Sequence, residues 1–377
     1  MAVQNRQEAG YSILLNINGQ EIPYQNVDGL VVRESIFSVL PRFNMILRDV
    51  GWLSSGTPAK TGDQIRVSIV SNAGKSGDVH FPFRVMRVSN QNVDPNMANT
   101  AILNVEGLLD FPGLFSGLNS VVFNEKFSDV VSEVAKTVGM KPKINITSND
   151  KMKWTCFGES YMKFLLKSLN HVHISEKECP VLYGSKSGEL IFDGIKRASE
   201  SPSRISLVFD PTATVTPTNY QDKDFIRKGH AESRINVPYS NWSAIDIKEY
   251  MDEFAGGNGI RLSYFDGEPV EKDWMPKDST GVTERMVYGV KTLNVHKNYY
   301  SAMVNNRLNK NSFFGTCITM NTGLFGFKPM DRVHVTIPAG NLGDTSKELS
   351  GEYLIFQVLT VFNRDAKGEM VSMAKID

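Results

Sequence analysis

Only one segment of the chain has residues spaced to hold a phosphate group. Ala73-Gly74-Lys75-Ser76 has the ending of a phosphate-binding loop. The full motif needs another glycine where Ile69 stands, and it joins a strand to a helix. Here the segment joins two strand patterns, so we expect no nucleotide and no other cofactor.

The histidines His171 and His173 have a spacing that would place both imidazoles on one face of a strand, as a metal pair would be. Glu176 and Glu178 follow them. A zinc site needs three or four converging ligands, and no second pair is evident. Asp222-Lys223-Asp224 lacks the glycine and the bidentate glutamate of a calcium loop. We expect a solvated strand edge at the histidines and no metal.

Candidate nucleophiles are equally sparse. Cys156 lies beside Trp154 and Phe157, as a thiol in a packed core would. The three cysteines have no redox or zinc spacing, and no Gly-x-Ser-x-Gly elbow occurs. We predict no catalytic residues and no enzyme. Sequence cannot place carboxylate pairs such as Asp252-Glu253 across a cleft, so a hydrolase stays open as an alternative.

Composition narrows the class of protein further. The 377 residues contain 41 Lys plus Arg and 41 Asp plus Glu, and 41% of them are hydrophobic. A globular protein of two to four domains fits this balance, whereas a dedicated nucleic-acid binder usually has a basic excess. Residues 1–10 are polar, and no apolar window approaches a membrane span. We expect a soluble protein made in a reducing cytoplasm.

The elements that must position these residues are mostly strands. Residues 11–109 alternate polar and apolar side chains, most clearly from Gln64 to Val70, as strands of a sandwich or barrel do. Residues 111–200 form a mixed α+β pattern. Its helices are expected near 127–138 and 159–169, and a hairpin turns at Ser185-Lys186-Ser187-Gly188.

The second half of the chain is less regular at first. Strands are expected at 205–209 and 260–265, a helix near 243–254 and a tight turn at Asp266-Gly267. A further helix is expected at 297–308. Strands then return at 317–320, 333–337, 353–362 and 370–374.

The last block of strands resembles the first. Asp63 to Ile69 matches Asp331 to Ile337, and Phe83 to Asn92 matches Phe356 to Asp365, in the same order and at similar spacing. A final strand follows each, Ala101 to Val105 and Met370 to Ala374. Alternating strands can match by chance, but three ordered segments favour a duplicated β domain. The candidate barrel-defining strand residues are Ile65, Val67, Ile69, Phe83, Val85, Val333, Val335, Ile337, Phe356 and Val358.

Four places in the sequence carry a family resemblance. They are Gly10 to Ile13 followed by Val31 to Phe37; Trp154 to Tyr161; the helix Tyr299 to Leu308 running into Gly315 to Cys317 and Gly326 to Asp331; and the closing hairpin Gly351 to Ala374. In this order they resemble the central baseplate hub protein of contractile-tailed bacteriophages. The same fold forms the N-terminal part of type VI secretion spike proteins. Met330 stands where the family often has glycine.

The resemblance implies an α+β, β-rich fold with two tail-tube-like β-barrel domains and a mixed α+β domain. The first barrel would occupy residues 1–110 and the α+β domain 111–200. The second barrel would combine 201–240 with 295–377, and 241–294 would be an inserted or peripheral segment.

The resemblance also implies a structural function. Three chains would form a pseudo-sixfold ring in the tail baseplate of the virion, joining the central spike to the tail tube. Its partners would be the trimeric spike, tail tube or tube-initiator proteins, the tape measure protein and other baseplate proteins. DNA would only pass through.

Two alternatives remain beside the hub. A type VI secretion or injection-machine hub usually carries its needle on the same chain, so here the spike would be a separate protein. A tail-associated cell-wall hydrolase would need a catalytic constellation, which the residues do not indicate. A plain tube subunit would have one barrel, which the internal match disfavours.

Overall fold

The computed structural model describes most of the chain in detail. The described residues are 11–22, 26–48, 59–71, 79–91, 102–203, 205–210, 233–238, 242–246, 259–265, 269–274, 283–290, 295–313, 316–322, 326–337, 346–363 and 367–376. The candidate phosphate loop at 73–76, the acidic segments at 222–224 and 252–253, and the turn at 266–267 lie outside these residues.

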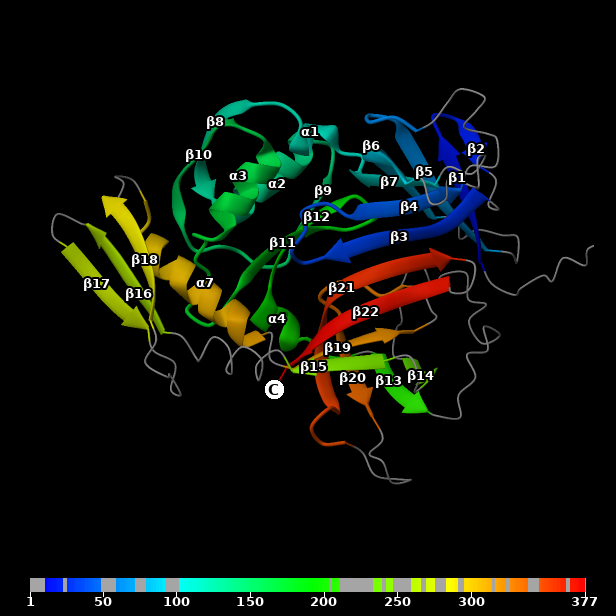
Figure 1. The fold of residues 1–377 in the computed structure, drawn as a ribbon. Helices are drawn as coiled ribbons and strands as arrows, with labels where there is room; N and C mark the ends of the chain where they lie inside the picture. The colour runs from blue at the N-terminus through cyan, green and yellow to red at the C-terminus, as the bar shows by residue number, and fades with distance from the viewer. Residues whose placement is uncertain are drawn as a thin grey trace, which may run out of the picture.

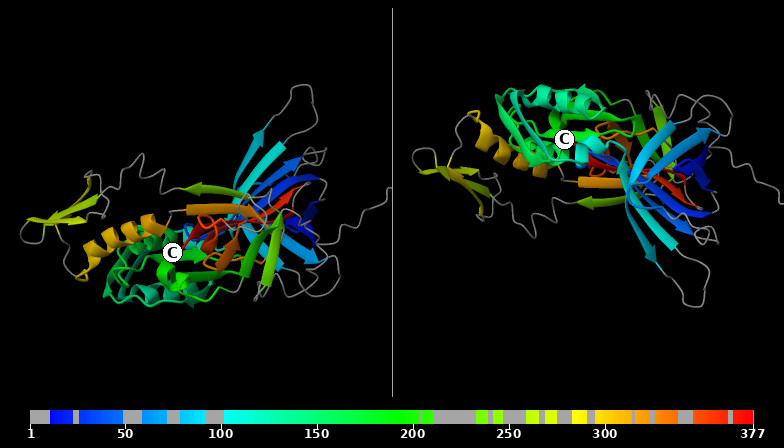
Figure 2. Two further views of the ribbon diagram at one scale, coloured as in Figure 1. Left: turned by 90° about the horizontal axis from the view of Figure 1, so that it is seen from below. Right: turned by 90° about the horizontal axis from the view of Figure 1, so that it is seen from above.

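One sheet of 14 strands dominates the described part of the chain (Figure 1). Its first half has the order β3-β4-β7-β6-β5-β1-β2. The bounds of these strands are β1 Tyr11–Ile17, β2 Gln20–Ile22, β3 Val27–Ser35, β4 Arg42–Arg48, β5 Gln64–Ser71, β6 Val79–Gln91 and β7 Ile102–Leu109. Figure 2 shows that the sheet is curled, with strands of this half fanning outward.

The second half of the sheet repeats this order as β15-β19-β22-β21-β20-β13-β14. Its strands are β13 Ile205–Asp210, β14 Ser233–Pro238, β15 Trp242–Asp246, β19 Thr316–Asn321, β20 Arg332–Thr336, β21 Gly351–Asn363 and β22 Lys367–Lys375. One difference lies at the end of the row. There β13 runs parallel to β20 and β14, whereas β1 is antiparallel to β5 and β2.

The long strand β21 joins the two halves. Its first residues, Gly351 to Leu354, pair with β20, and its later residues, Gln357 to Asn363, pair with β3. Because one strand serves both neighbours, the two halves share a continuous ladder of backbone hydrogen bonds.

Small features of the backbone also recur in the two halves. The pairing of β6 with β7 skips Met86, and the pairing of β21 with β22 skips Phe356, so each long strand has a bulge at the same place. Gly62 N–H donates to the Val85 carbonyl at 2.8 Å, and Met330 N–H donates to the Ile355 carbonyl at 2.7 Å. The halves therefore match in detail as well as in strand order.

The turn before β5 recurs before β20. Lys60 N–H donates to Asp63 Oδ2 at 2.7 Å, and Lys328 N–H donates to Asp331 Oδ2 at 3.0 Å. The third residue of each turn has a left-handed φ, +93° at Gly62 and +70° at Met330. Glycine adopts this conformation without strain, whereas methionine does not. Met330 keeps it because its side chain is buried against the α+β unit.

The structure corrects one detail of the sequence match. Asp63 and Asp331 are equivalent as predicted, but Phe83, which pairs with Ile65, corresponds to Tyr353, which pairs with Val333. The sequence match aligned Phe83 with Phe356 instead. An alternating pattern repeats every two residues and a bulge changes its phase, and both matched segments contain a bulge, so pattern alone does not determine the register.

An α+β unit lies between the halves in sequence and packs beside the sheet (Figure 1). It contains two small sheets, β8 paired with β10, and β11-β12-β9. Its elements are α1 Pro112–Phe115, β8 Asn119–Lys126, α2 Phe127–Thr137, β9 Lys141–Ile144, β10 Lys151–Glu159, α3 Tyr161–Leu169, β11 Pro180–Gly184, β12 Glu189–Gly194 and α4 Ile195–Ser199.

The helices of this unit follow the predicted periodicity. Phe127, Val130, Val131 and Val134 are buried on one face of α2, and Gly139 follows with φ +82°, which suits the end of a helix. Ser160 caps α3 by accepting a hydrogen bond from Lys163 N–H at 3.3 Å. The predicted hairpin with its turn at 185–188 is confirmed as β11 and β12.

Helix α7 (Tyr299–Phe313) packs against the loop that follows α3. Asn306 Nδ2 donates to the carbonyl oxygens of Asn170 and Val172 at 3.1 and 2.9 Å, and the ring of Tyr299 stacks on that of His171 at 3.9 Å. A separate three-stranded sheet precedes α7 in sequence. Its strands are β16 Gly259–Phe265, β17 Pro269–Trp274 and β18 Thr283–Val290.

Two local predictions were wrong. The helix expected near 243–254 begins instead as strand β15, which pairs with β19, and residues 247–254 lie outside the described part. His171 and His173 lie in the loop after α3 rather than on a strand. At β15, pairing with a distant strand overrides a weak local pattern, whereas the histidines follow directly after the end of α3 at Leu169.

The fold is therefore β-rich and α+β, as predicted. Among the described residues, no helix is both long and apolar enough to cross a membrane.

Candidate functional site

The residues that looked reactive in the sequence do not form a reactive centre in the described structure. Cys156, Cys179 and Cys317 are buried and form no disulfide. Burial raises the pKa of Cys156, and raises that of Cys179 to about 12. A thiol held in its neutral form is a poor nucleophile, so these side chains serve packing.

The histidine pair is used for packing as well. His171 stacks on Tyr299, while His173 N–H donates to Asp150 Oδ2 at 3.0 Å. His296 Nε2 lies 3.3 Å from the same carboxylate oxygen. Burial lowers the pKa of His296 and raises that of Asp150. Within the described ranges, no group of three or more His, Cys, Asp or Glu side chains could hold a metal ion.

Eight of the ten candidate strand residues fall into two cores. Ile65, Val67, Phe83 and Val85 are buried in the core of the first half. The second-half core contains Val333, Val335, Ile337 and Val358, with Ile337 directly after β20. Phe356 is partly buried at the bulge of β21, where it packs against the α+β unit, and Ile69 lies in β5 opposite Val79.

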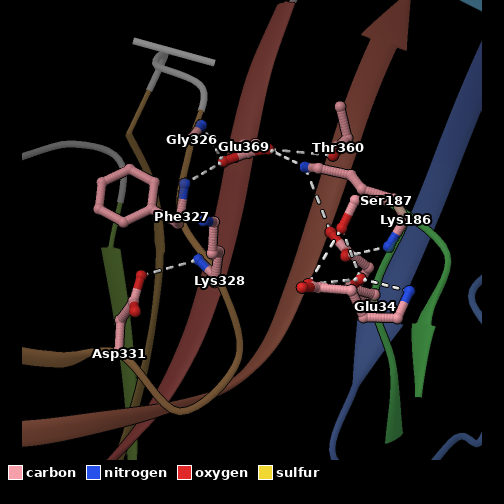
Figure 3. Close-up of polar contacts among 11 residues, drawn as sticks. Glu34, Lys186, Ser187, Gly326, Phe327, Lys328, Asp331, Thr360 and Glu369 are labelled. Carbon is pink, nitrogen blue, oxygen red and sulfur yellow. Dashed lines mark hydrogen bonds and ion pairs between the residues drawn. The ribbon is translucent and has the colours of Figure 1, made fainter. Parts of the chain in front are cut away.

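The structure brings together a charged cluster that the sequence analysis missed. Lys186 lies in the turn between β11 and β12, Glu34 lies on β3, and Glu369 lies on β22. Figure 3 shows the Lys186 side chain between the two carboxylates. Its Nζ lies 2.7 Å from Glu369 Oε1 and 3.2 Å from Glu34 Oε2. We call these three residues the buried ion cluster.

The turn that carries Lys186 has a fixed backbone. Gly188 N–H donates to the Ser185 carbonyl at 2.9 Å, and Glu189 N–H donates to Ser185 Oγ at 3.1 Å. Lys186 N–H itself donates to Glu34 Oε1 at 2.7 Å. The turn therefore binds Glu34 through both its backbone and its side chain.

Glu369 connects the cluster to a second turn. Its Oε2 accepts the N–H groups of Gly326 and Phe327, both at 2.8 Å, and its Oε1 accepts the Thr360 hydroxyl at 3.2 Å. Thr322 donates its hydroxyl and its N–H to the Glu369 carbonyl at 2.8 and 3.0 Å. The carboxylate is thus satisfied by one cation and three neutral donors.

The three charges lie in a dry environment. The Lys186 side chain is 14% exposed, and those of Glu34 and Glu369 are 3% and 1% exposed. Burial raises the pKa of Glu34, against the attraction of Lys186. Although burial opposes it, the two carboxylates together raise the pKa of Lys186. Glu34 Oε2 is near Nζ but makes no hydrogen bond of good geometry in the described structure.

The position of the cluster indicates its role. β21 and β3 pair where the halves meet, and the cluster fixes the α+β unit to β3 and to β22, the neighbour of β21. A cation with buried carboxylates could also serve acid–base chemistry, but every side chain here is already engaged by the protein. The arrangement fits a rigid joint between three parts of the chain.

Sequence carried only a faint sign of this cluster. Lys186 stands in a turn, where lysine is normally solvated, and Glu34 and Glu369 stand in predicted strand segments, close to apolar residues. A carboxylate at an inward position of a strand needs a buried partner, and that requirement is a usable signal. The partner itself lies 152 residues from Glu34 and could not be identified.

No known family model and no curated protein matches the sequence of this chain. Solved structures do match it. A tail protein from Neisseria meningitidis MC58 is similar over 98% of this chain and 97% of its own, with 11% identity and a TM-score of 0.59. The 43 kDa tail protein of prophage MuSo2 from Shewanella oneidensis is similar over 97% and 98%, with 12% identity and a TM-score of 0.61.

These matches extend over nearly the whole of both chains, so they concern the complete arrangement of sheet halves and α+β unit rather than one common motif. Their low identity limits them to the fold. The chain's structural neighbours are tail proteins, consistent with the resemblance to a baseplate hub that its sequence predicted.

Proposed function

We propose that this protein is a structural component of a phage tail, the hub of its baseplate. The observation that carries the proposal is the seven-strand order that occurs twice in one chain, with the same bulge and the same turn. Two equivalent halves let three chains present six similar positions to a sixfold tube. The fold of tail proteins supports this reading.

In this proposal each half is a tail-tube-like barrel. The first comprises residues 1–110, the α+β domain 111–200, and the second 201–240 with 295–377. Strand β15, within the segment 241–294, pairs with β19 and is counted with the second barrel. The rest of that segment would be peripheral.

The ring would connect the trimeric spike on one side to tail tube or tube-initiator proteins on the other. Tape measure protein and DNA would pass through its centre, and other baseplate proteins would surround it. The function is mechanical and needs no catalysis. The buried ion cluster would keep the two barrels of each chain at a fixed angle.

The test measures the mass of the purified protein, alone and with its spike protein, by light scattering, and images the particles by negative stain. A three-chain ring with six similar lobes is expected. A persistent monomer in the presence of the spike contradicts the proposal. Cell-wall degradation by the purified protein would favour the hydrolase instead.

A further inference from the structure

The two halves of the sheet differ on one face. In the second half, Cys317, Leu354, Phe356 and Ala374 lie on the face away from its core and pack against the α+β unit. That unit contributes α4, β11 and β12, and the end of α7 packs there as well. The face is apolar because protein covers it.

Register identifies the equivalent positions in the first half. Arg42 pairs with Leu108 as Cys317 pairs with Ala374, and Leu108 pairs with Arg84 as Ala374 pairs with Leu354. Met86 is the bulge residue equivalent to Phe356. Arginine therefore occupies two positions at which the second half has Cys and Leu.

This face of the first half is open. Met86 and Ile46 are 43% and 41% exposed, large fractions for apolar side chains on a sheet. The side chains of Arg33, Arg42 and Arg87 are exposed as well. We call Arg33, Arg42, Ile46, Met86 and Arg87 the arginine face.

The charges of this face are poorly matched within the chain. Arg33 lies directly opposite Arg42 on the neighbouring strand, an arrangement that costs stability. By contrast, Arg48 pairs with Asp28 at 2.9 Å and Arg84 with Asp110 at 2.7 Å. No described residue forms an ion pair with Arg33, Arg42 or Arg87.

One carboxylate does lie nearby. Glu106 is opposite Arg87 in the register, but it is half-buried and accepts a hydrogen bond from Asn104 at 3.4 Å. It offsets one of the three unpaired charges and leaves the face basic. A repulsive pair that the fold retains is expected where a partner provides the missing charge.

From these observations we propose that the arginine face binds another tail protein, through a surface that presents carboxylates around an apolar centre. The inference rests on the proposed function, since it takes the partner from the same tail. Ile46 and Met86 supply the apolar contact, and the three arginines supply orientation and specificity. The partner would cover the first half as the α+β unit covers the second.

The experiment uses Arg42→Glu with Arg87→Glu in the full chain. Purified tail-tube protein and purified spike protein of the same tail are the probes, each titrated separately onto immobilised chain. Binding of one probe is expected to weaken about tenfold or more in the variant and to weaken with salt in the wild type. Lys151→Glu with Lys153→Glu, on the exposed side of β10, is the control and should bind normally.

A single Arg42→Glu variant separates binding from folding. It places a carboxylate opposite Arg33, so its melting temperature should rise or stay equal while binding falls. The mass of each variant alone is measured first, so that failure to form the ring can be distinguished from failure to bind the partner. Equal binding by variant and wild type, or binding of neither probe, overturns the inference. The inference is also overturned if the variants lose binding only to duplex DNA, or lose only self-association, while binding of both protein probes is unchanged.

Discussion

At the scale of single residues, Asp331 shows how one turn is used differently in the two halves. Its equivalent, Asp63, makes the same hydrogen bond, and both aspartates are partly exposed. Asp331 differs in following Met330, which packs against the α+β unit, and desolvation raises the pKa of Asp331 to about 6 from an ordinary value of 3.8. The hydrogen bond from Lys328 N–H opposes this rise without cancelling it.

The shift predicts a pH dependence of stability. The folded state holds the proton of Asp331 more tightly than the unfolded chain, so the free energy of unfolding falls as pH rises from about 4 to about 6. Asp331→Asn keeps the acceptor oxygen and has no charge to bury. We expect the variant to be more stable than the wild type above pH 6, by about 1–3 kcal/mol.

Urea unfolding of both proteins from pH 4 to pH 8 measures this difference. Asp63→Asn is the matched control for removing the charge from the same turn. A constant difference in the free energy of unfolding between Asp331→Asn and wild type across this range would contradict the prediction, because the Asp331 carboxyl group would then not titrate within it.

The cysteines support a second prediction at this scale. Cys179 is buried, its Sγ donates to the Asn306 carbonyl at 3.5 Å, and its pKa is raised to about 12. Because the thiolate is the reactive form, a disulfide reagent at pH 8 should label none of the three cysteines in the folded protein within minutes. All three should react in urea. Rapid labelling of one native thiol would show that a core region is open.

At the scale of elements, the sheet depends on a close approach between β4 and β7. A Cβ atom on Gly107 would overlap the ring of Phe43 and the backbone carbonyl of Arg84. The equivalent position of the second half, Met373, carries a full side chain into its core. The two halves thus share an order of strands but fill their cores differently.

Gly107→Ala tests this difference. The added methyl group would overlap a backbone carbonyl and a buried ring, and moving either one disturbs the packing of the core. We therefore expect a loss of about 1–3 kcal/mol in the free energy of unfolding. Gly29→Ala in β3 is the control, because its Cβ atom would contact only the Phe362 carbonyl oxygen, at 3.9 Å. Equal unfolding midpoints for the two variants would contradict the packing.

Elements also show what sequence could predict. The α2 and α3 helices, the β11–β12 hairpin and the closing strands follow from periodicity and turn residues. The strand at 242–246 could not, because its partner β19 lies far along the chain. The correspondence of β6 with β21 was equally hidden, since an alternating pattern repeats every two residues and the bulge in each strand changes its phase. Local patterns determine elements, whereas pairing depends on contacts between distant segments.

At the scale of the whole molecule, three parts meet at the buried ion cluster. The α+β unit provides Lys186, the first half provides Glu34, and the second half provides Glu369. Desolvation makes such a cluster a weak source of stability, but its geometry is specific, since few other arrangements would satisfy all three charges. We expect it to determine how the halves are oriented.

Removing the cation is therefore the sharpest test of this joint. Lys186→Met leaves two buried carboxylates without their partner, and we expect a loss of about 3–5 kcal/mol in the free energy of unfolding at pH 8. The loss should shrink towards pH 5, because protonation relieves an unpaired buried carboxylate. Adding Glu34→Gln and Glu369→Gln to Lys186→Met should recover much of the stability, since no buried charge then remains.

Lys196→Met, at an exposed lysine that pairs with Glu200 at 3.6 Å, is the control and should cost less than about 1 kcal/mol. Hydrogen exchange distinguishes a joint from a local contact. If the cluster orients the halves, Lys186→Met should expose the amides of β3 and β21 along their shared ladder before those of the α2 core. Faster exchange confined to the 185–188 turn would mean that the halves hold their orientation without it, through backbone pairing alone.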